Sequence, residues 1–374
     1  MNKGDTFTLL DKRVFILIMW PYLAQMIYSV YNDYYIDVTQ YYLTFFLSLI
    51  IFVFSTSRVR IDIRCKTENR KILRFIKYIF LFLFAFKIFQ FFKVFNSGIG
   101  YDQIRNFYFN SEDRFSELYY NSKILLYLMF YVYPSILLFL FLNSIFKREK
   151  MFIWTSVFIF DGLFSAGRFN IYIMMICFFI FFKFSYRKLF TFAIPIIFLS
   201  GFIQLMRGDA DFKLIDTWIS IVHYHIVPII IFNNGLDSSF IDNIIGNTLF
   251  SGYIYIAKPL IGSGLQWELI QDSLQHNWVP LVGTSKVYNA FGNILLFSYW
   301  DYLFVGPIII AFLYSFFCRI RVDNRNPAKI MLVWLAMNIY FSSLKMKLFA
   351  PDALIFICLF IAIYPLTIKK GVIK

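Results

Sequence analysis

The chain has 374 residues, of which 60% are apolar and 16% are charged, and its formal net charge is +14. A soluble domain carries about 45–50% apolar and about 25% charged residues, so this composition excludes a cytosolic enzyme, a disordered chain and a secreted disulfide scaffold. It indicates an all-α polytopic membrane protein. Most of the basic residues lie in the loops that are predicted to face the cytoplasm, as described below. The positive charge therefore gives no reason to expect a nucleic acid partner.

Apolar stretches of about 15–22 residues predict the transmembrane helices of one integral membrane domain over residues 1–374. We expect about ten of them, with up to twelve if the doubtful segment 217–232 contributes. That segment contains Pro228, so it is expected to be interfacial or re-entrant, or to pair with a further span near 243–262. The ten spans are predicted at 14–32, 39–57, 75–95, 124–145, 152–167, 169–185, 189–206, 302–320, 330–344 and 353–368.

The distribution of charge predicts the orientation of these spans. With a cytoplasmic N-terminus, alternating spans place 24 of the 36 basic residues on the inner side, but only 6 of the 22 acidic residues. Such an excess of lysine and arginine is typical of cytoplasmic loops. Ten spans also return the C-terminus, with Lys369 and Lys370, to the cytoplasm. All four cysteines fall on the inner side or in spans, so no outer disulfide is expected.

Two long loops are predicted on the outer face, at 96–123 and at 207–301, the second between spans seven and eight. The second loop contains all three histidines and many of the glycines. Most inner loops are short and merely basic. Any chemistry is therefore expected on the outer face.

Arg168 lies at the outer turn between the fifth and sixth spans, in the sequence Ser-Ala-Gly-Arg-Phe-Asn. Gly167 allows a tight chain reversal, which leaves the guanidinium at the membrane surface. There it can hold a phosphate through two parallel hydrogen bonds, which a lysine cannot do. An arginine that only snorkels to lipid headgroups is the structural alternative.

Arg207 follows the seventh span and could bind a phosphate or simply pair with Asp209. Together, Asp209 and Asp211 are similar to the metal-binding motif of soluble nucleotide-sugar transferases. That motif needs a nucleotide-binding domain around it, which this chain lacks. We therefore expect neither a metal site nor a cofactor.

His223 and His225 flank Tyr224 in the doubtful segment, far from His276. Residues two apart on a helix diverge by about 200°, so these histidines do not form a zinc pair. One of them could act as a general base on a sugar hydroxyl, because an unperturbed histidine titrates near pH ~6.5. A hydrogen-bonded histidine at the interface is the alternative that the pattern favours.

Asp161 lies inside the fifth predicted span. An ionisable group at that depth is costly and usually faces a partner or a cavity. Lys87 and Lys93 of the third span are the candidate partners. We expect a structural ion pair.

The span order and loop sizes resemble those of the Wzy-type O-antigen polymerases, which join oligosaccharide repeat units at the inner membrane of Gram-negative bacteria. The resemblance is strongest at Gly167-Arg168, at Met206-Arg207-Gly208 and over 289–301. The last stretch is similar to the family's Asn…Thr…Asp-x-Gly-x-x-Gly entry into a late span.

This resemblance implies the fold of the C-type membrane glycosyltransferases, with a large periplasmic loop, and a metal-independent reaction. The enzyme would transfer the growing glycan from undecaprenyl pyrophosphate to the non-reducing end of a new lipid-linked repeat unit. It would be a multi-pass inner-membrane protein, surrounded by membrane lipids, with a separate chain-length regulator as a partner. An O-antigen ligase and a lipid-linked oligosaccharide flippase are the alternatives.

The resemblance and the outer-face residues together give two sets of expected site residues. The catalytic set combines cations for the pyrophosphate with candidate bases: Arg168, Arg207, His223, His225 and Asp301. The substrate-binding set comprises Arg105, Arg114, Tyr224, Lys258 and Lys286.

Overall fold

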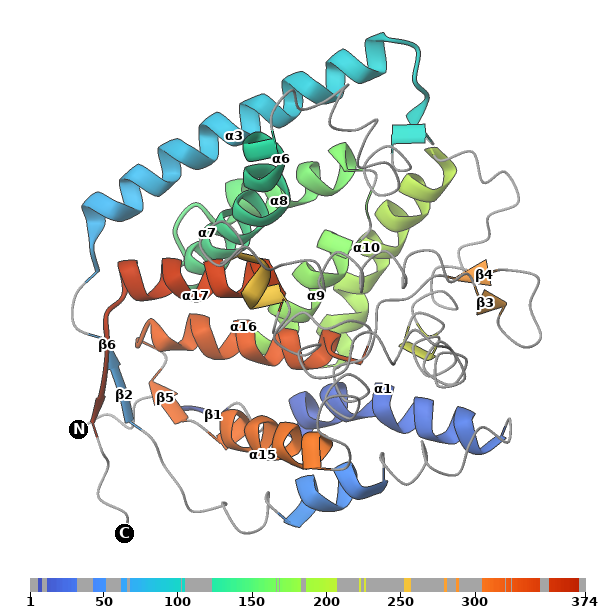
Figure 1. The fold of residues 1–374 in the computed structure, drawn as a ribbon, viewed down its shortest axis with the longest axis vertical. Coiled ribbons are helices and arrows are strands. Elements are labelled where there is room, and N and C mark those ends of the chain that lie inside the picture. Colours follow the sequence, from blue (N-terminus) through green and yellow to red (C-terminus); the bar gives the residue numbers. More distant parts are fainter. Residues whose placement is uncertain are drawn as a thin grey trace. The chain divides into compact units, whose positions relative to one another are not determined.

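The fold is that of a computed structural model, and it is predominantly helical over the residues that the structure describes (Figure 1). Its strands are only two to four residues long. The all-α prediction holds at this level. The described residues are 6–8, 12–31, 43–51, 62–65, 68–101, 103–104, 123–165, 167, 169–182, 186–206, 222, 225–226, 252–256, 279–280, 287–288, 305–319, 321–323, 325–343 and 350–369.

Every predicted span overlaps a helix. The second span corresponds to helical residues 43–51, and the fourth to the continuous run of α6, the π-helical turn η1 and α7. The remaining spans each match one helix. The bounds are α1 Lys12–Tyr31, α3 Arg70–Asn96, α6 Lys123–Tyr127, η1 Leu128–Val132, α7 Tyr133–Lys147, α8 Met151–Phe164, α9 Phe169–Phe182, α10 Tyr186–Met206, α15 Val305–Arg319, α16 Ala328–Phe341 and α17 Pro351–Ile363.

Two of the described helical segments, Arg13–Tyr31 and Leu128–Lys147, are long and apolar enough to cross a membrane. The apolar helices α8, α9, α16 and α17 have only 13 or 14 residues. A 14-residue helix is about 21 Å long, which is less than the ~30 Å of a hydrocarbon core. An association with a membrane is thus weakly supported, and the number of ten spans stays a prediction.

The chain forms two compact units. Unit 1 comprises residues 1–64, 219–354 and 368–374, and unit 2 comprises 65–218 and 355–367. Among the described residues, three two-stranded sheets accompany the helices. Their strands pair as β1 (Thr6–Thr8) with β5 (Arg321–Asp323), β2 (Asp62–Cys65) with β6 (Leu366–Lys369), and β3 (Val279–Pro280) with β4 (Val287–Tyr288).

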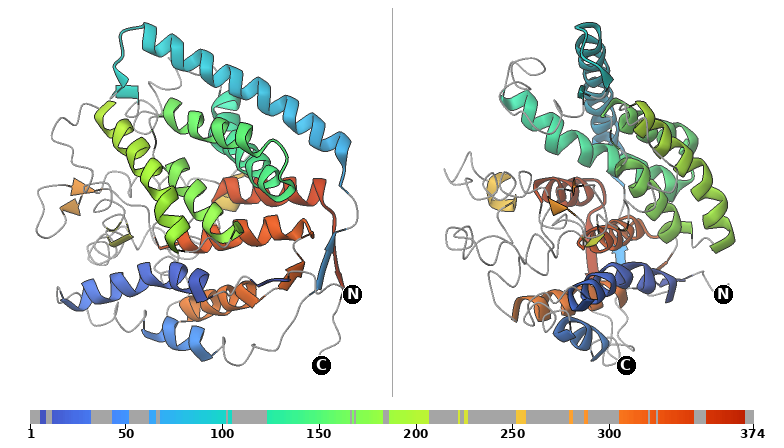
Figure 2. Two further views of the ribbon diagram at one scale, coloured as in Figure 1. Left: turned by 180° about the vertical axis from the view of Figure 1, so that it is seen from behind. Right: turned by 90° about the vertical axis from the view of Figure 1, so that its right-hand side faces the viewer.

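The core of unit 1 is organised around α16, which is buried along almost its whole length. This helix lies against α1 and α15 (Figure 2). Asn326 caps its start, because the side-chain oxygen accepts a hydrogen bond from the amide of Ala328 at 2.9 Å. At its other end, Ser342 is hydrogen-bonded to the hydroxyl of Tyr22 on α1. Apolar packing and polar contacts therefore both join α1 to α16.

Unit 2 is held together by aromatic contacts around α7, which packs against α3, α8 and α9. The rings of Phe141 and Phe158 are stacked, with centroids 4.5 Å apart. On α3, the buried residues recur every three or four positions, as expected for one face of a helix. Lys87 belongs to this buried face and is only 5% exposed. The helix therefore directs a cation into the interior of unit 2.

Candidate functional site

Lys87 of α3 and Asp161 of α8 form a buried ion pair, with Nζ 2.5 Å from Oδ1. Both residues are 5% exposed. The structure confirms the pairing that was expected from the sequence and selects Lys87 rather than Lys93. A buried charge without a partner would be costly, whereas a hydrogen-bonded pair is tolerated.

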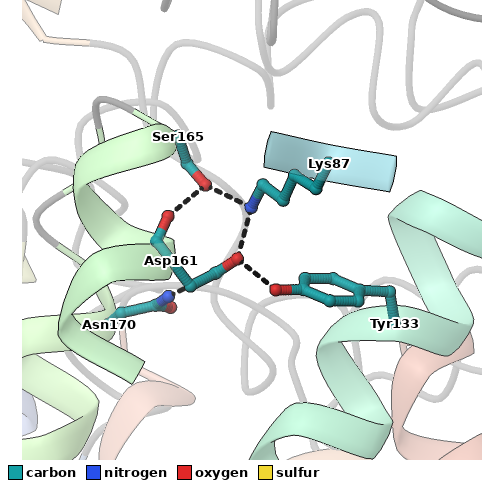
Figure 3. Close-up of polar contacts among 5 residues, drawn as sticks. All are labelled: Lys87, Tyr133, Asp161, Ser165 and Asn170. Carbon is teal, nitrogen blue, oxygen red and sulfur yellow. Dashed lines mark hydrogen bonds and ion pairs between the residues drawn. The ribbon is translucent and has the colours of Figure 1, made fainter. Parts of the chain in front are cut away.

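Three further side chains contact this ion pair (Figure 3). The hydroxyl of Tyr133 donates to Asp161 Oδ1 at 2.6 Å, and the amide of Asn170 donates to Oδ2 at 2.7 Å. Lys87 Nζ also donates to the hydroxyl of Ser165 at 2.7 Å and lies 5.1 Å from the centre of the Tyr133 ring. We call these five residues the Asp161 network. Four of them lie on α3, α7, α8 and α9, and Ser165 lies in the turn that follows α8.

The backbone after Asp161 turns sharply because of its local sequence. The amide of Ser165 donates to the carbonyl of Asp161 at 3.0 Å, and the amide of Gly167 donates to the carbonyl of Gly162 at 2.9 Å. A Cβ atom on Gly162 would lie 3.1 Å from the carbonyl oxygen of Gly167. Glycine at position 162 thus permits the close approach of the turn that precedes α9.

His225 lies in unit 1, where it is 3% exposed and hydrogen-bonded. Its Nδ1 is 2.7 Å from the hydroxyl of Ser343, which itself donates to the carbonyl of Tyr340 at 3.2 Å. Gln25 of α1 donates to the carbonyl of His225 and, at 2.9 Å, to that of Ser343. The rings of Trp20 and Tyr340 meet the imidazole edge-on, with centroids 5.0 and 5.2 Å away.

Burial lowers the pKa of His225 to about 3, so the imidazole is neutral at pH 7. A general base works best with a pKa near the operating pH. His225 is thus hydrogen-bonded, whereas its expected place at a membrane interface stays a prediction. Its geometry favours packing over proton transfer.

Tyr253 is a second titratable group of unit 1 with a shifted pKa. Burial, followed by the negative charge of Asp352, raises the pKa of its hydroxyl to about 12. The side chain therefore stays protonated across the physiological range and can act as a hydrogen-bond donor.

Of the expected site residues, His225 alone lies within the described part of the chain. The others fall outside it: Arg105, Arg114, Arg168, Arg207, His223, Tyr224, Lys258, Lys286 and Asp301. Asp209 and Asp211 also lie outside it. Among the residues that are described, no three His, Cys, Asp or Glu side chains gather as metal ligands.

The structure adds polar partners that the sequence did not point to. Tyr133, Ser165 and Asn170 join the Asp161 network, while Gln25 and Ser343 surround His225. A polar side chain inside an apolar span indicates that it needs a hydrogen-bonding partner, and both Gln25 and Tyr133 lie inside predicted spans. Their partners could not be identified in this way, because the contacts join separate helices.

Compared with known protein families, functionally characterised proteins and solved structures, the chain shows no significant match. Its candidate function therefore rests on its own residues and on the resemblance described above.

Proposed function

We propose that this protein is an O-antigen polymerase, a glycosyltransferase of the bacterial inner membrane. It transfers the growing glycan from undecaprenyl pyrophosphate to the non-reducing end of a new lipid-linked repeat unit at the periplasmic face. Ten spans with cytoplasmic termini carry the reaction site on their outer side, without a metal or another cofactor. A chain-length regulator of the same pathway is the proposed protein partner.

One observation supports this proposal most directly: described residues on either side of Arg168 are hydrogen-bonded to α8. Gly167, immediately before it, is hydrogen-bonded to Gly162, and Asn170, two residues after it, is hydrogen-bonded to Asp161. Neighbours that are fixed in advance lower the entropy cost of binding, which favours a role in phosphate binding for an arginine at this point of the sequence.

The leaving group of the proposed reaction is a pyrophosphate, on which negative charge increases as the glycosidic bond breaks. Arg168 and Arg207 follow the predicted outer ends of the fifth and seventh spans, and two cations there would stabilise that charge. Arg105, Arg114, Lys258 and Lys286 supply further positive charge for the lipid-linked substrates.

The acceptor sugar hydroxyl needs orientation and a base. His223 and Asp301 are the proposed bases. We assign His225 to packing, because it ties its segment to α1 and to the end of α16 through Gln25 and Ser343. Tyr224, between the two histidines, offers a flat face for a sugar ring. Holding both substrates in a reactive orientation would supply much of the acceleration.

The test of this function is a lipopolysaccharide gel from a strain that lacks the chain. Core carrying a single repeat unit and no ladder is the expected result, because flipping and ligation still operate. Bare core would contradict the proposal. Long polymer on undecaprenyl pyrophosphate would then indicate a ligase, and single units trapped on the inner face would indicate a flippase.

Arg168→Ala and Arg207→Ala should each abolish chain extension in the complemented strain. Arg→Lys at either position should restore only part of it, because lysine cannot bind a phosphate through two parallel hydrogen bonds. Arg187→Ala is the matched control, since Arg187 is an exposed arginine on the predicted inner side. Full-length polymer from either alanine variant at normal expression would remove that arginine from the mechanism.

Chelation should leave the activity unchanged. EDTA added to the purified enzyme is expected to have no effect on polymer length or rate. Inhibition that a divalent ion reverses would instead assign a metal to Asp209 and Asp211.

A further inference from the structure

Three chain segments meet at one end of unit 2: the start of α3, the turn between α7 and α8, and the end of α17. Lys147, the last residue of α7, forms an ion pair with Glu68, which precedes α3. The amide of Asn69 donates to the carbonyl of Ile363, the last residue of α17, at 3.0 Å (Figure 1). Lys147 Nζ also lies 6.0 Å from the centre of the Tyr364 ring. These contacts bring the first turns of α3 beside the turn that joins α7 to α8.

This end of unit 2 carries an excess of exposed cations. In the stretches 68–74 and 147–151, five basic side chains are exposed, and Glu149 is the one exposed acid. We call the five the basic corner: Arg70, Lys71, Arg74, Arg148 and Lys150. None of them forms an ion pair with another described residue. An anion from outside the chain can therefore bind there without displacing a described acid.

The stability of the helices does not account for these cations. The N-terminus of a helix carries a partial positive charge, so a cation there is unfavourable. Arg70 and Lys71 are the first two residues of α3, and Lys150 is the N-cap residue of α8. Neither helix has an acidic residue in its first turn to offset them. The starts of the two helices thus add to the positive potential of the basic corner.

The turn between α7 and α8 holds two of the cations in an unfavourable backbone conformation. Arg148 and Lys150 have φ angles of 55° and 50°, in the left-handed region that favours glycine. Arg148 is the C-cap residue of α7, and a glycine commonly takes the left-handed conformation at such a helix end. Charged side chains at both positions therefore strain the backbone, and strain of this kind is typical of functional sites.

An exposed aromatic stripe on α3 continues from the basic corner. Its residues follow Lys71 by 4, 7, 11 and 18 positions, so they share one face of a helix. They are Phe75, Tyr78, Phe82 and Phe89, and each is 63–68% exposed. From the first to the last, the stripe is about 21 Å long, which exceeds the ~15 Å of hydrocarbon in one leaflet.

We infer that the basic corner binds the headgroup of an anionic phospholipid, whose acyl chain lies against the stripe on α3. Cations alone would fit any anion, but cations that border an apolar stripe fit an amphiphile. The predicted topology places the basic corner at the inner ends of the third, fourth and fifth spans, where the cytoplasmic leaflet is negatively charged. The proposed polymerisation takes place on the opposite face, so this lipid site does not depend on that proposal.

The experiment measures the apparent Kd of the first lipid bound by the purified full-length protein, using native mass spectrometry. Phosphatidylglycerol is the anionic probe, and it should bind more tightly than zwitterionic phosphatidylcholine. Arg148→Gln and Lys150→Gln should each weaken its binding about fivefold, and together about 30-fold, as expected for the loss of one surface cation each. Arg187→Gln is the matched control and should leave the Kd unchanged, since Arg187 is an exposed arginine on the predicted inner side but belongs to α10.

A second pair of substitutions separates the loss of charge from a folding defect. Arg148→Gly and Lys150→Gly remove the same two charges, but glycine suits the left-handed backbone. The combined glycine variant should therefore keep its Tm in the absence of lipid and still lose phosphatidylglycerol binding. Unchanged phosphatidylglycerol binding in this variant would overturn the inference. An equal loss in Arg187→Gln and Arg148→Gln would also overturn it, because only the net charge would then matter.

The stripe distinguishes a phospholipid from a free phosphate. Phe75→Ser should weaken phosphatidylglycerol binding several-fold, whereas Phe202→Ser on α10, which alters another exposed phenylalanine, should not. Inorganic phosphate should not displace the lipid. Displacement by inorganic phosphate, together with no effect of Phe75→Ser, would overturn the inference and assign the basic corner to a soluble anion. None of these measurements uses polymerase activity, so their outcome is independent of the proposed function.

Discussion

At the scale of single residues, the buried histidine makes stability depend on pH. The pKa of His225 is lowered to about 3 by burial, whereas an unfolded histidine titrates near ~6.5. The unfolded state therefore takes up a proton first, so the contribution of His225 to stability is complete above pH ~6.5 and decreases as the pH falls towards 3. When the pH is lowered from 7.5 to 5.0, the Tm measured in detergent should decrease less for His225→Asn than for the wild-type protein. An equal loss would contradict this assignment, and His276→Asn serves as the control.

The two charged or polar clusters differ in how far the sequence could predict them. Asp161 and Lys87 were identified because a charge inside an apolar span requires a partner. The partners of His225 could not be found in this way. Gln25 and Ser343 lie 200 and 118 positions away, and no local pattern relates them to the histidine. Side-chain hydrogen bonds between distant helices depend on tertiary packing, which composition and spacing do not report.

At the scale of the helices, the apolar stretches gave their locations, but not all of their ends. The last span was expected to reach residue 368, whereas α17 ends at Ile363. Pro365 explains this difference, because a proline disfavours the helical conformation in the residue before it. The apolar residues after the proline continue as the strand β6. Hydrophobicity alone therefore predicted one element where the backbone forms two.

The packing of α7 against α8 gives a prediction for the stability of unit 2. Phe141 is fully buried and stacks on Phe158, whereas Phe82 of α3 is 68% exposed. Phe141→Ala should lower the free energy of unfolding by about 3 kcal/mol, because it leaves a cavity between the helices. Phe82→Ala should change it by less than about 0.5 kcal/mol. Denaturant unfolding in detergent micelles measures both, and similar losses in the two variants would show that this stacked pair does not support the unit.

At the scale of the whole molecule, the charge of the loops and the positions of the described helices both bear on the predicted ten-span topology. The helices lie where the apolar windows predicted them, and the loops between them alternate in charge. Neither observation fixes the number of crossings, because four of the apolar helices are shorter than a bilayer requires. The topology depends most on the segment 217–232, since a single extra crossing there would place every later loop on the opposite side of the membrane.

Labelling of introduced cysteines would test this topology. In a background without the four native cysteines, Glu112→Cys should react with a membrane-impermeant maleimide in intact spheroplasts. Glu149→Cys and Lys370→Cys should react only after permeabilisation, because both positions are predicted to face the cytoplasm. Labelling of Lys370→Cys in intact spheroplasts, with Glu149→Cys still protected, would mean an odd number of crossings after residue 149. The additional crossing would then be assigned to 217–232, and Arg207 and Asp301 would lie on opposite sides of the membrane. Protection of Lys370→Cys keeps them together on the outer face, as a shared site for the pyrophosphate and the acceptor sugar requires.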